Sequence, residues 1–172
     1  MRNSFFPAMI ALFLFFTSCN DAEKTSGPSA AAQKNLDAFH AVDSAFQTGD
    51  VSRIDQVVAS DFLDHTPNGD MKGTDSLKAM ITMMKNAGDV KSEIKKVLAD
   101  DEYVMAWMHW TGTSNGSVPG MPPAGPIDMS GVEVVRFKDG KAVEHWAFMD
   151  AVEAMKMMTP PAPNPTSTDK PR

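Results

Sequence analysis

The sequence predicts one α+β domain in which helices come first and an antiparallel sheet follows. Two observations carry this prediction. Apolar residues recur at helical spacing up to Gly88, and beyond it the period changes to two. The dipeptide Asp139-Gly140 separates two apolar-rich runs and suits a two-residue hairpin, because both positions tolerate positive φ. Helices followed by a run of antiparallel strands are typical of the α+β class.

Three helices are expected before Gly88, at residues 33–48, around residue 54 and at residues 74–87. In the first helix Leu36, Phe39 and Phe46 share one face, and Gly49 ends it. The third helix carries apolar residues at i, i+3, i+4 and i+7, namely Leu77, Met80, Ile81 and Met84. Between the second and third helices a short strand is expected, which Pro67 stops.

Four longer strands follow, at residues 90–98, 103–113, 127–138 and 141–149. The stretch 114–126 is rich in Gly and Pro and predicts a long loop at the end of the sheet. A regular turn at Asp139-Gly140 pairs Lys138 with Lys141. One face of the hairpin is then expected to hold Glu133, Val135, Phe137, Trp146, Phe148 and Asp150, with His145 on the other face. Both faces are apolar in the middle, so one is expected to pack on the helices and the other on a second copy, as a homodimer.

The first residues indicate export. Phe5 to Phe16 is an apolar run too short to span a bilayer and typical of a signal peptide. Cys19 follows small residues and resembles a lipobox cysteine. Residues 1–18 therefore predict a lipoprotein signal, 19–32 a flexible tether, 33–158 the domain and 159–172 a disordered Pro-rich tail. The expected location is the bacterial cell envelope, on the periplasmic or surface face of a membrane held through the lipid alone. The alternatives are an ordinary cleaved signal and an uncleaved anchor.

The net charge and the spacing of the histidines indicate which kinds of partner and ligand are not expected. Removing the signal takes only Arg2 from 16 basic residues, so 15 basic and 22 acidic residues leave a net charge of −7. Without a basic run, nucleic acid is not an expected partner. The four histidines show neither HxH nor HExxH spacing, so no metal is expected, and no cofactor is expected either.

The order of motifs resembles a known family. Asp64-His65-x-Pro67 and Gly112-Thr113 come first, a Gly120-x-Pro122-Pro123 loop follows, and the sequence ends in Asp139-Gly140-Lys141, Glu144-His145-Trp146 and Asp150. This is similar to the SnoaL-like polyketide or ester cyclase group of the nuclear transport factor 2-like superfamily, over about residues 35–158. The resemblance implies a cone-shaped α+β barrel, with three N-terminal helices on a strongly curved antiparallel sheet and a pocket inside the cone.

The same resemblance implies acid/base ring closure without metal or nucleotide, with Asp150 at the position of the catalytic aspartate. The chain departs from the family pattern at Ser114, Ala124 and Pro126. If the histidine common at the first of these positions polarises a carbonyl, this chain lacks it. These departures weigh against a cyclase reaction specifically, and fold alone does not assign the reaction.

Two residues are the expected catalytic pair. Asp150 is the candidate general base, its pKa raised by an apolar pocket. The alternative for Asp150 is an N-cap of a short helix over 151–158. His65 is expected to hold a ligand oxygen, and its alternative is a hydrogen bond to the nearby turn.

The expected ligand-binding residues are His40, Asp43, Trp110, Glu133, Trp146 and Phe148. His40 and Asp43 lie three residues apart on a helix and can meet, either to orient a ligand or as a buried pair. The aromatic residues line the pocket or fill the core. His145 is expected to serve dimer packing or structure.

The sequence therefore leaves two functions open. One is an envelope-anchored enzyme that acts on a small, largely apolar carbonyl or ester molecule, of cyclase or isomerase type. The other is a non-catalytic lipoprotein that binds a hydrophobic ligand in the same pocket. A purely structural role for a dimer is a third, weaker alternative.

Overall fold

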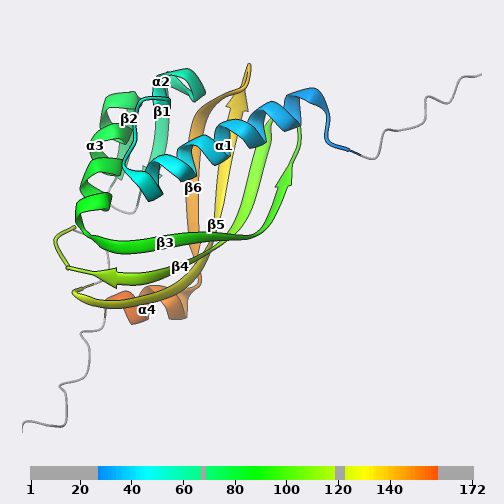
Figure 1. Cartoon of the computed structure of the whole chain (residues 1–172). Helices are drawn as coiled ribbons and strands as arrows, with labels where there is room; N and C mark the ends of the chain where they lie inside the picture. The colour runs from blue at the N-terminus through cyan, green and yellow to red at the C-terminus, as the bar shows by residue number, and fades with distance from the viewer. Residues whose placement is uncertain (1–26, 67–68, 119–122, 159–172) are drawn as a thin grey trace, which may run out of the picture.

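The computed structural model describes residues 27–66, 69–118 and 123–158 (Figure 1). The predicted signal peptide, the lipidation residue Cys19 and the predicted Pro-rich tail lie outside these residues, as does most of the predicted tether. The first helix begins at Ala30, with Ser29 as its N-cap, and Ala32 is buried. Residues 30–32 therefore belong to the domain and not to the tether.

The predicted α+β class is confirmed. The elements run α1 (Ala30–Thr48), α2 (Ile54–Val57), β1 (Val58–Thr66), β2 (Gly69–Lys72), α3 (Gly73–Asn86), β3 (Gly88–Ala99), β4 (Tyr103–Ser114), β5 (Gly125–Lys138), β6 (Lys141–Met149) and α4 (Ala151–Met158). The sequence prediction missed only β2, whose four residues follow a segment outside the described ranges. Gly49 ends α1 in the left-handed conformation, as expected.

The strands form one six-stranded sheet in the order β2-β1-β6-β5-β4-β3. Every neighbouring pair is antiparallel except β1 and β6, which are parallel. The expectation of a wholly antiparallel sheet is therefore wrong for one pair, because β1 reaches the sheet from the helical half of the chain and not through a hairpin. Figure 1 shows β3, β4 and β5 curving around α1, which lies across the concave face, with α2 and α3 beside β1 and β2.

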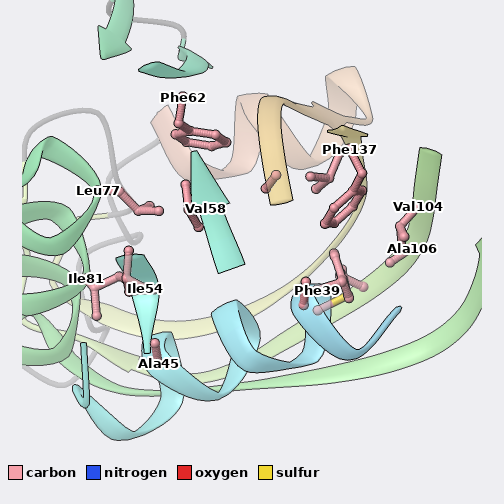
Figure 2. Close-up of a cluster of buried hydrophobic side chains, with 14 residues drawn as sticks. Phe39, Ala45, Ile54, Val58, Phe62, Leu77, Ile81, Val104, Ala106 and Phe137 are labelled. Atoms are coloured by element: carbon pink, nitrogen blue, oxygen red, sulfur yellow. The ribbon is translucent and has the colours of Figure 1, made fainter. Parts of the chain in front are cut away.

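The hydrophobic core lies between the helices and the concave face of the sheet (Figure 2). Phe39 from α1, Ile81 from α3 and Val104 from β4 are each at most 4% exposed. Burial of one such aliphatic or aromatic side chain stabilises the fold by about 1.5–3 kcal/mol. The three N-terminal helices therefore pack on one face of the sheet, as the sequence predicted.

The β5–β6 hairpin has the expected turn and an unexpected register. Lys138 pairs with Lys141, and Asp139 and Gly140 have φ values of 55° and 75°. Beyond the turn Phe137 pairs with Ala142, but the next pair joins Arg136 to Glu144, so Val143 is an extra residue on β6. This β-bulge shifts the ladder by one residue.

The shift changes which side chains share a face. Glu133 now pairs with Ala147, Val134 pairs with Trp146 and Val132 pairs with Phe148. The concave face holds Glu133, Val135, His145 and Ala147. The convex, outer face holds Val132, Val134, Trp146 and Phe148. The expectation that Glu133 shares a face with Trp146 and Phe148 is wrong, because a strict two-residue alternation does not survive a bulge.

Candidate functional site

Five polar side chains gather on the concave side of the sheet, and we call them the interior polar group. They are Asp43, Asp64, Ser92, Glu133 and His145, from α1, β1, β3, β5 and β6. The Ser92 hydroxyl donates to Asp43 Oδ1 at 2.6 Å, and His145 Nδ1 lies 2.8 Å from Asp64 Oδ1. Polar groups are costly to bury without partners, so their concentration on the side of the sheet that carries the hydrophobic core marks this place as the candidate site.

Asp64 positions His145. Asp64 is 3% exposed, and the parallel β1–β6 ladder sets the two residues directly opposite each other. A carboxylate at Nδ1 favours the imidazole form that carries a proton there, so Nε2 is the ring nitrogen suited to proton exchange. Burial acts to lower the pKa of His145, but the hydrogen bond that its ring donates to Asp64 and the charges of Glu133 and Asp64 outweigh burial and raise it.

Glu133 is the acid/base candidate of the interior polar group. Burial raises the pKa of the Glu133 carboxyl above its ordinary value. His145 opposes this shift, while the nearby carboxylates Asp43 and Asp64 add to it. A carboxyl group whose pKa lies closer to neutrality is a stronger base when ionised and holds a proton more readily, which suits proton transfer.

The outer face carries a second polar arrangement, built around His65. Its Nε2 lies 2.9 Å from Glu144 Oε1, and its Nδ1 lies 3.0 Å from Asp70 Oδ1. Arg136 donates to the other Glu144 oxygen from Nε at 2.9 Å and from a terminal nitrogen at 2.6 Å. The His65 ring stacks on Trp146 with centroids 5.1 Å apart. Hydrogen bonds that the ring donates to the carboxylates of Glu144 and Asp70 raise the pKa of His65.

This arrangement corrects the expectations for two residues. Both ring nitrogens of His65 are bonded to carboxylates, so the ring is held as part of a surface network and not aimed at a ligand in the interior. Trp146 lies on the same outer face, and so does Phe148, which is 57% exposed. Neither aromatic residue lines the concave side.

Asp150 does not face the interior in the structure. It is exposed, and its Oδ1 accepts a hydrogen bond of 2.7 Å from the backbone N–H of Val152 in the first turn of α4. The helix-capping alternative therefore describes its geometry. The bulge is the physical reason, because it puts His145 and Ala147 on the concave face opposite Val135 and Glu133, and the alternation continued past Met149 then puts Asp150 on the other side.

The expected His40–Asp43 pair does not form. His40 is exposed, and its ring meets Phe39 edge-on at a centroid distance of 6.0 Å. Asp43 instead accepts hydrogen bonds from Ser92 and from Gln47, the latter at 2.9 Å. Of the predicted ligand-binding residues, Asp43, Glu133 and Trp110 therefore lie on the concave side.

Trp110 packs against the core from β4, half-buried. Gly131 on the neighbouring strand makes room for it, since a Cβ at Gly131 would lie 3.1 Å from the Trp110 ring. Sequence reasoning missed Asp64 and Ser92 altogether and placed His145 on the wrong face. The Asp64-His65-x-Pro67 motif contained Asp64, and its spacing of two residues from Phe62 on a strand was a second available signal.

Three further findings describe the surroundings. A surface hollow of about 500 Å³ lies where the start of α1 meets the β3–β4 turn, lined by Ser29, Ala32 and residues 99–102, and it contains no member of the interior polar group. Within the described ranges, no three His, Cys, Asp or Glu side chains are grouped as a metal ion requires. None of the described helices has the length and apolar composition needed to cross a bilayer.

The comparisons with known proteins agree on one family and fold. The model of a family described as SnoaL-like polyketide cyclase matches residues 36–157. No curated protein sequence matches the chain. A candidate SnoaL-like polyketide cyclase from Jannaschia sp. CCS1 superposes with a TM-score of 0.67 at 19% identity, covering 78% of this chain and 99% of that one.

Two other solved structures are similar. A candidate polyketide cyclase from Bacillus cereus ATCC 10987 has 27% identity and a TM-score of 0.59, covering 74% of this chain and 81% of that one. TsrD from Streptomyces laurentii has 19% identity and a TM-score of 0.62, and the match covers 77% of this chain and 97% of TsrD. The two structures at 19% identity support the cone-shaped fold alone.

Proposed function

Because the chain belongs to the SnoaL-like polyketide cyclase family, we propose that it binds a small, largely apolar carbonyl or ester molecule on the concave side of its sheet and moves a proton on it without a cofactor. The family and the curved fold support a ligand in this place. The reaction is of cyclase or isomerase type. The single observation that carries the proposal is Glu133, with its raised pKa, beside the Asp64–His145 pair.

The geometry suits removal of a proton next to a carbonyl group. Glu133 and His145 are diagonal neighbours across the β5–β6 ladder, with Cβ atoms about 7 Å apart, so the two side chains project from the same part of the concave face. Protonated His145, held by Asp64, donates a hydrogen bond from Nε2 to the ligand carbonyl oxygen. The Glu133 carboxylate takes the α-proton, the C–H electron pair forms the C=C bond, and the C=O π pair moves onto the oxygen, giving an enolate that the Nε2–H of His145 stabilises.

The enolate then has two fates. In an isomerisation it takes the proton back from Glu133 at another carbon. In a cyclisation its carbon attacks a second carbonyl group of the same molecule, and the proton passes to the new alkoxide. Neither route consumes an oxidant, a reductant or a metal.

Asp150 and His65 remain the alternative catalytic pair from the family resemblance. Asp150 is exposed and accepts a hydrogen bond from the Val152 N–H, which weighs against Asp150 as the base. Both ring nitrogens of His65 contact carboxylates, which weighs against His65 as the residue that holds a ligand oxygen. The two assignments predict opposite results for two isosteric variants.

The experiment measures deuterium uptake from D2O at the α-carbon of α-tetralone and of methyl phenylacetate, by mass spectrometry. Glu133→Gln is expected to lower the protein-dependent uptake at least about 100-fold, the usual effect of losing a general base, while Asp150→Asn leaves it unchanged. Loss of uptake in Asp150→Asn with full uptake in Glu133→Gln would return the role to Asp150. Melting temperatures of both variants show whether each remains folded.

A non-catalytic binding protein is the second candidate function. The residues Ser114, Ala124 and Pro126, which depart from the family pattern, favour it. Mass spectrometry of the purified protein for a co-purifying lipophilic molecule, together with thermal shifts on adding it back, separates the two functions. Binding without any conversion or deuterium uptake supports this candidate.

We also propose that the protein works at the bacterial cell envelope, tethered through acylated Cys19. The support is the sequence of the first twenty residues. Cys19→Ser in the full chain is expected to move the protein from the membrane fraction to the soluble fraction and to remove the mass of the acyl chains. An unchanged membrane fraction with an unmodified cysteine would contradict the anchor.

A further inference from the structure

The interior polar group carries more negative charge than the described residues compensate. It contains a single imidazole, that of His145, and the carboxyl groups of Asp43, Asp64 and Glu133. The charges that shift the pKa of Glu133 come from the other three of these residues, and no described lysine or arginine is among them. Even when Glu133 is protonated and His145 is charged, two carboxylates face one imidazolium. One negative charge on the concave side therefore lacks a counter-charge.

The Glu133 carboxyl group is accessible to a ligand. Its oxygens have no hydrogen-bond partner among the described residues. Every fully buried side-chain nitrogen or oxygen atom of those residues has such a partner, so the Glu133 oxygens are not sealed inside the core. The residue is half-buried, and the protein around it is close enough to raise its pKa. A carboxyl group in this position favours a ligand that brings a positive charge or a hydrogen-bond donor.

Asp43 is oriented by neutral donors, which leave its charge in place. The Ser92 hydroxyl donates to Oδ1 at 2.6 Å, and Gln47 Nε2 donates to Oδ2 at 2.9 Å. No described lysine, arginine or histidine forms an ion pair with Asp43. The helix that carries it, α1, lies across the concave face of the sheet (Figure 1). Asp43 therefore presents an oriented and uncompensated carboxylate on this side of the sheet.

Trp110 is the aromatic neighbour of this carboxylate. It pairs with Ser92 across the β3–β4 ladder, so it lies beside the residue that orients Asp43. Its ring extends toward Gly131 on β5, where a Cβ would lie 3.1 Å from the ring. Gly131 and Glu133 are successive residues on the concave face of β5, so the ring lies on the path from Asp43 to Glu133. The face of an indole ring attracts cations, as a carboxylate does.

We propose that the concave site is specific for a carbonyl molecule that also carries a cationic nitrogen, a quaternary or protonated amine. Asp43 and the Trp110 ring hold the cationic group, and the carbonyl oxygen lies at His145. This inference rests on the proposed function, from which it takes the places of the carbonyl group and of the base Glu133, and it adds the charge of the substrate. The same carboxylates repel molecules that carry a carboxylate of their own.

Three aromatic ketones that differ in charge test the inference with the purified protein. They are the cation para-acetyl-N,N,N-trimethylanilinium, uncharged para-tert-butylacetophenone and the anion para-acetylbenzoate. The first two have the same shape, so the ratio of their dissociation constants reports the effect of charge.

Isothermal titration calorimetry measures these constants at about 150 mM salt, where the attraction of the acidic protein as a whole is screened beyond about 8 Å. We expect the cation to bind at least about 10-fold more tightly than the uncharged ketone. The anion should bind at least about 10-fold more weakly than the uncharged ketone.

Variants of α1 identify the residue responsible. Asp43→Asn removes the charge and keeps the shape, so the preference for the cation over the uncharged ketone should fall at least about 5-fold. Asp43→Glu keeps the charge and should keep most of the preference. Asp37→Asn is the matched control, because Asp37 is exposed on the same helix and accepts a hydrogen bond of 2.9 Å from Gln33. This control should leave the preference unchanged.

The outcomes separate this inference from the proposed function. An uncharged ketone that binds as tightly as the cation, or a preference that Asp37→Asn lowers as much as Asp43→Asn does, would overturn the inference and leave the proposed function in place. So would deuterium uptake into α-tetralone by a protein that binds none of the three ketones. A cation that binds with the expected preference but takes up no deuterium at its acetyl methyl group would support the inference and contradict the proposed proton transfer. The comparison in the natural protein stands even if a variant does not fold.

Discussion

Glu133 shows how one residue can contribute to function at a cost to stability. Its carboxylate lies among Asp43 and Asp64, with one imidazole to offset three carboxyl groups. The raised pKa means that the folded protein binds a proton at Glu133 more tightly than the unfolded chain does. Ionisation of Glu133 therefore destabilises the fold, and this cost appears as the pH rises above the ordinary value of 4.5.

Glu133→Gln should remove this cost. The melting temperatures of the variant and the natural protein should lie closest together at pH 5, because the raised pKa delays the ionisation of Glu133 as the pH rises. At pH 8 the variant should melt several degrees higher, because glutamine carries no charge to bury. Thermal denaturation from pH 5 to pH 8 measures the difference. A difference that stays constant over this range would contradict the raised pKa.

Asp64→Asn should act in the opposite direction. It removes the charge that holds His145 and leaves a buried imidazole with a weaker partner, so we expect a loss of about 1–3 kcal/mol in the free energy of unfolding. The pKa of His145, followed by NMR, should fall. Asp61→Asn is the matched control, an exposed aspartate on the same strand, and should change neither quantity.

The residue scale is also where sequence reasoning had the least success. It identified Glu133, Asp43 and Trp110 as residues of the concave side. It assigned Asp150 to the interior and His145 to the outer face. Both errors have the same origin, since one inserted residue, Val143, decides the direction of every later side chain on β6.

At the scale of elements, local signals predicted the helices and strands within a few residues, except β2. Gly49, Gly88 and the Asp139-Gly140 turn mark boundaries by their backbone conformation, which the sequence encodes locally. The β-bulges of this sheet are not marked by a local sequence signal of this kind. Neither the one at Val143 nor the shift in β3 near Lys95 coincides with a glycine or proline.

The substitution Gly112→Ala tests the close contact between strands β3 and β4. Gly112 lies where β3 and β4 approach closely, with φ of 141°, and a Cβ there would lie 1.9 Å from the Asp89 carbonyl oxygen. Gly112→Ala should therefore cost more than about 2 kcal/mol and open the β3–β4 end of the sheet. Gly69→Ala is the control, since Gly69 also has positive φ but no atom within 4 Å of its Cβ position. Urea unfolding of both variants separates the clash from backbone strain, and equal losses would contradict the close approach.

At the scale of the whole molecule, the order of elements predicted the α+β class, and the family resemblance supplied the cone. The pairing of β1 with β6 could not be predicted from the sequence. It joins residues about 80 positions apart, and packing rather than a local turn brings them together.

The charges of the whole molecule predict a stability maximum on the acid side of neutrality. Hydrogen bonds lower the pKa of Asp100 and Glu144, so their contribution is lost as the pH falls below the ordinary values of 3.8 and 4.5. The pKa of His65 and His145 is raised, so their contribution is lost as the pH rises above the ordinary value of 6.5. Glu133 adds to the loss at high pH.

We therefore expect the free energy of unfolding to be greatest between pH 4.5 and 6.5. Urea denaturation at half-unit steps from pH 3 to pH 9 measures this profile. A protein whose stability rises steadily from pH 6 to pH 9 would be inconsistent with the raised pKa values of the two histidines.

The most direct measurement is an NMR titration of the Glu133 side-chain carboxyl carbon in the natural protein, with Glu133→Gln to assign the signal. The proposed chemistry requires a midpoint well above 4.5, which shifts when His145 changes its charge. A midpoint at or below 4.5 would mean that the carboxylate is solvated like any surface glutamate, and the proton-transfer role assigned to Glu133 would be wrong.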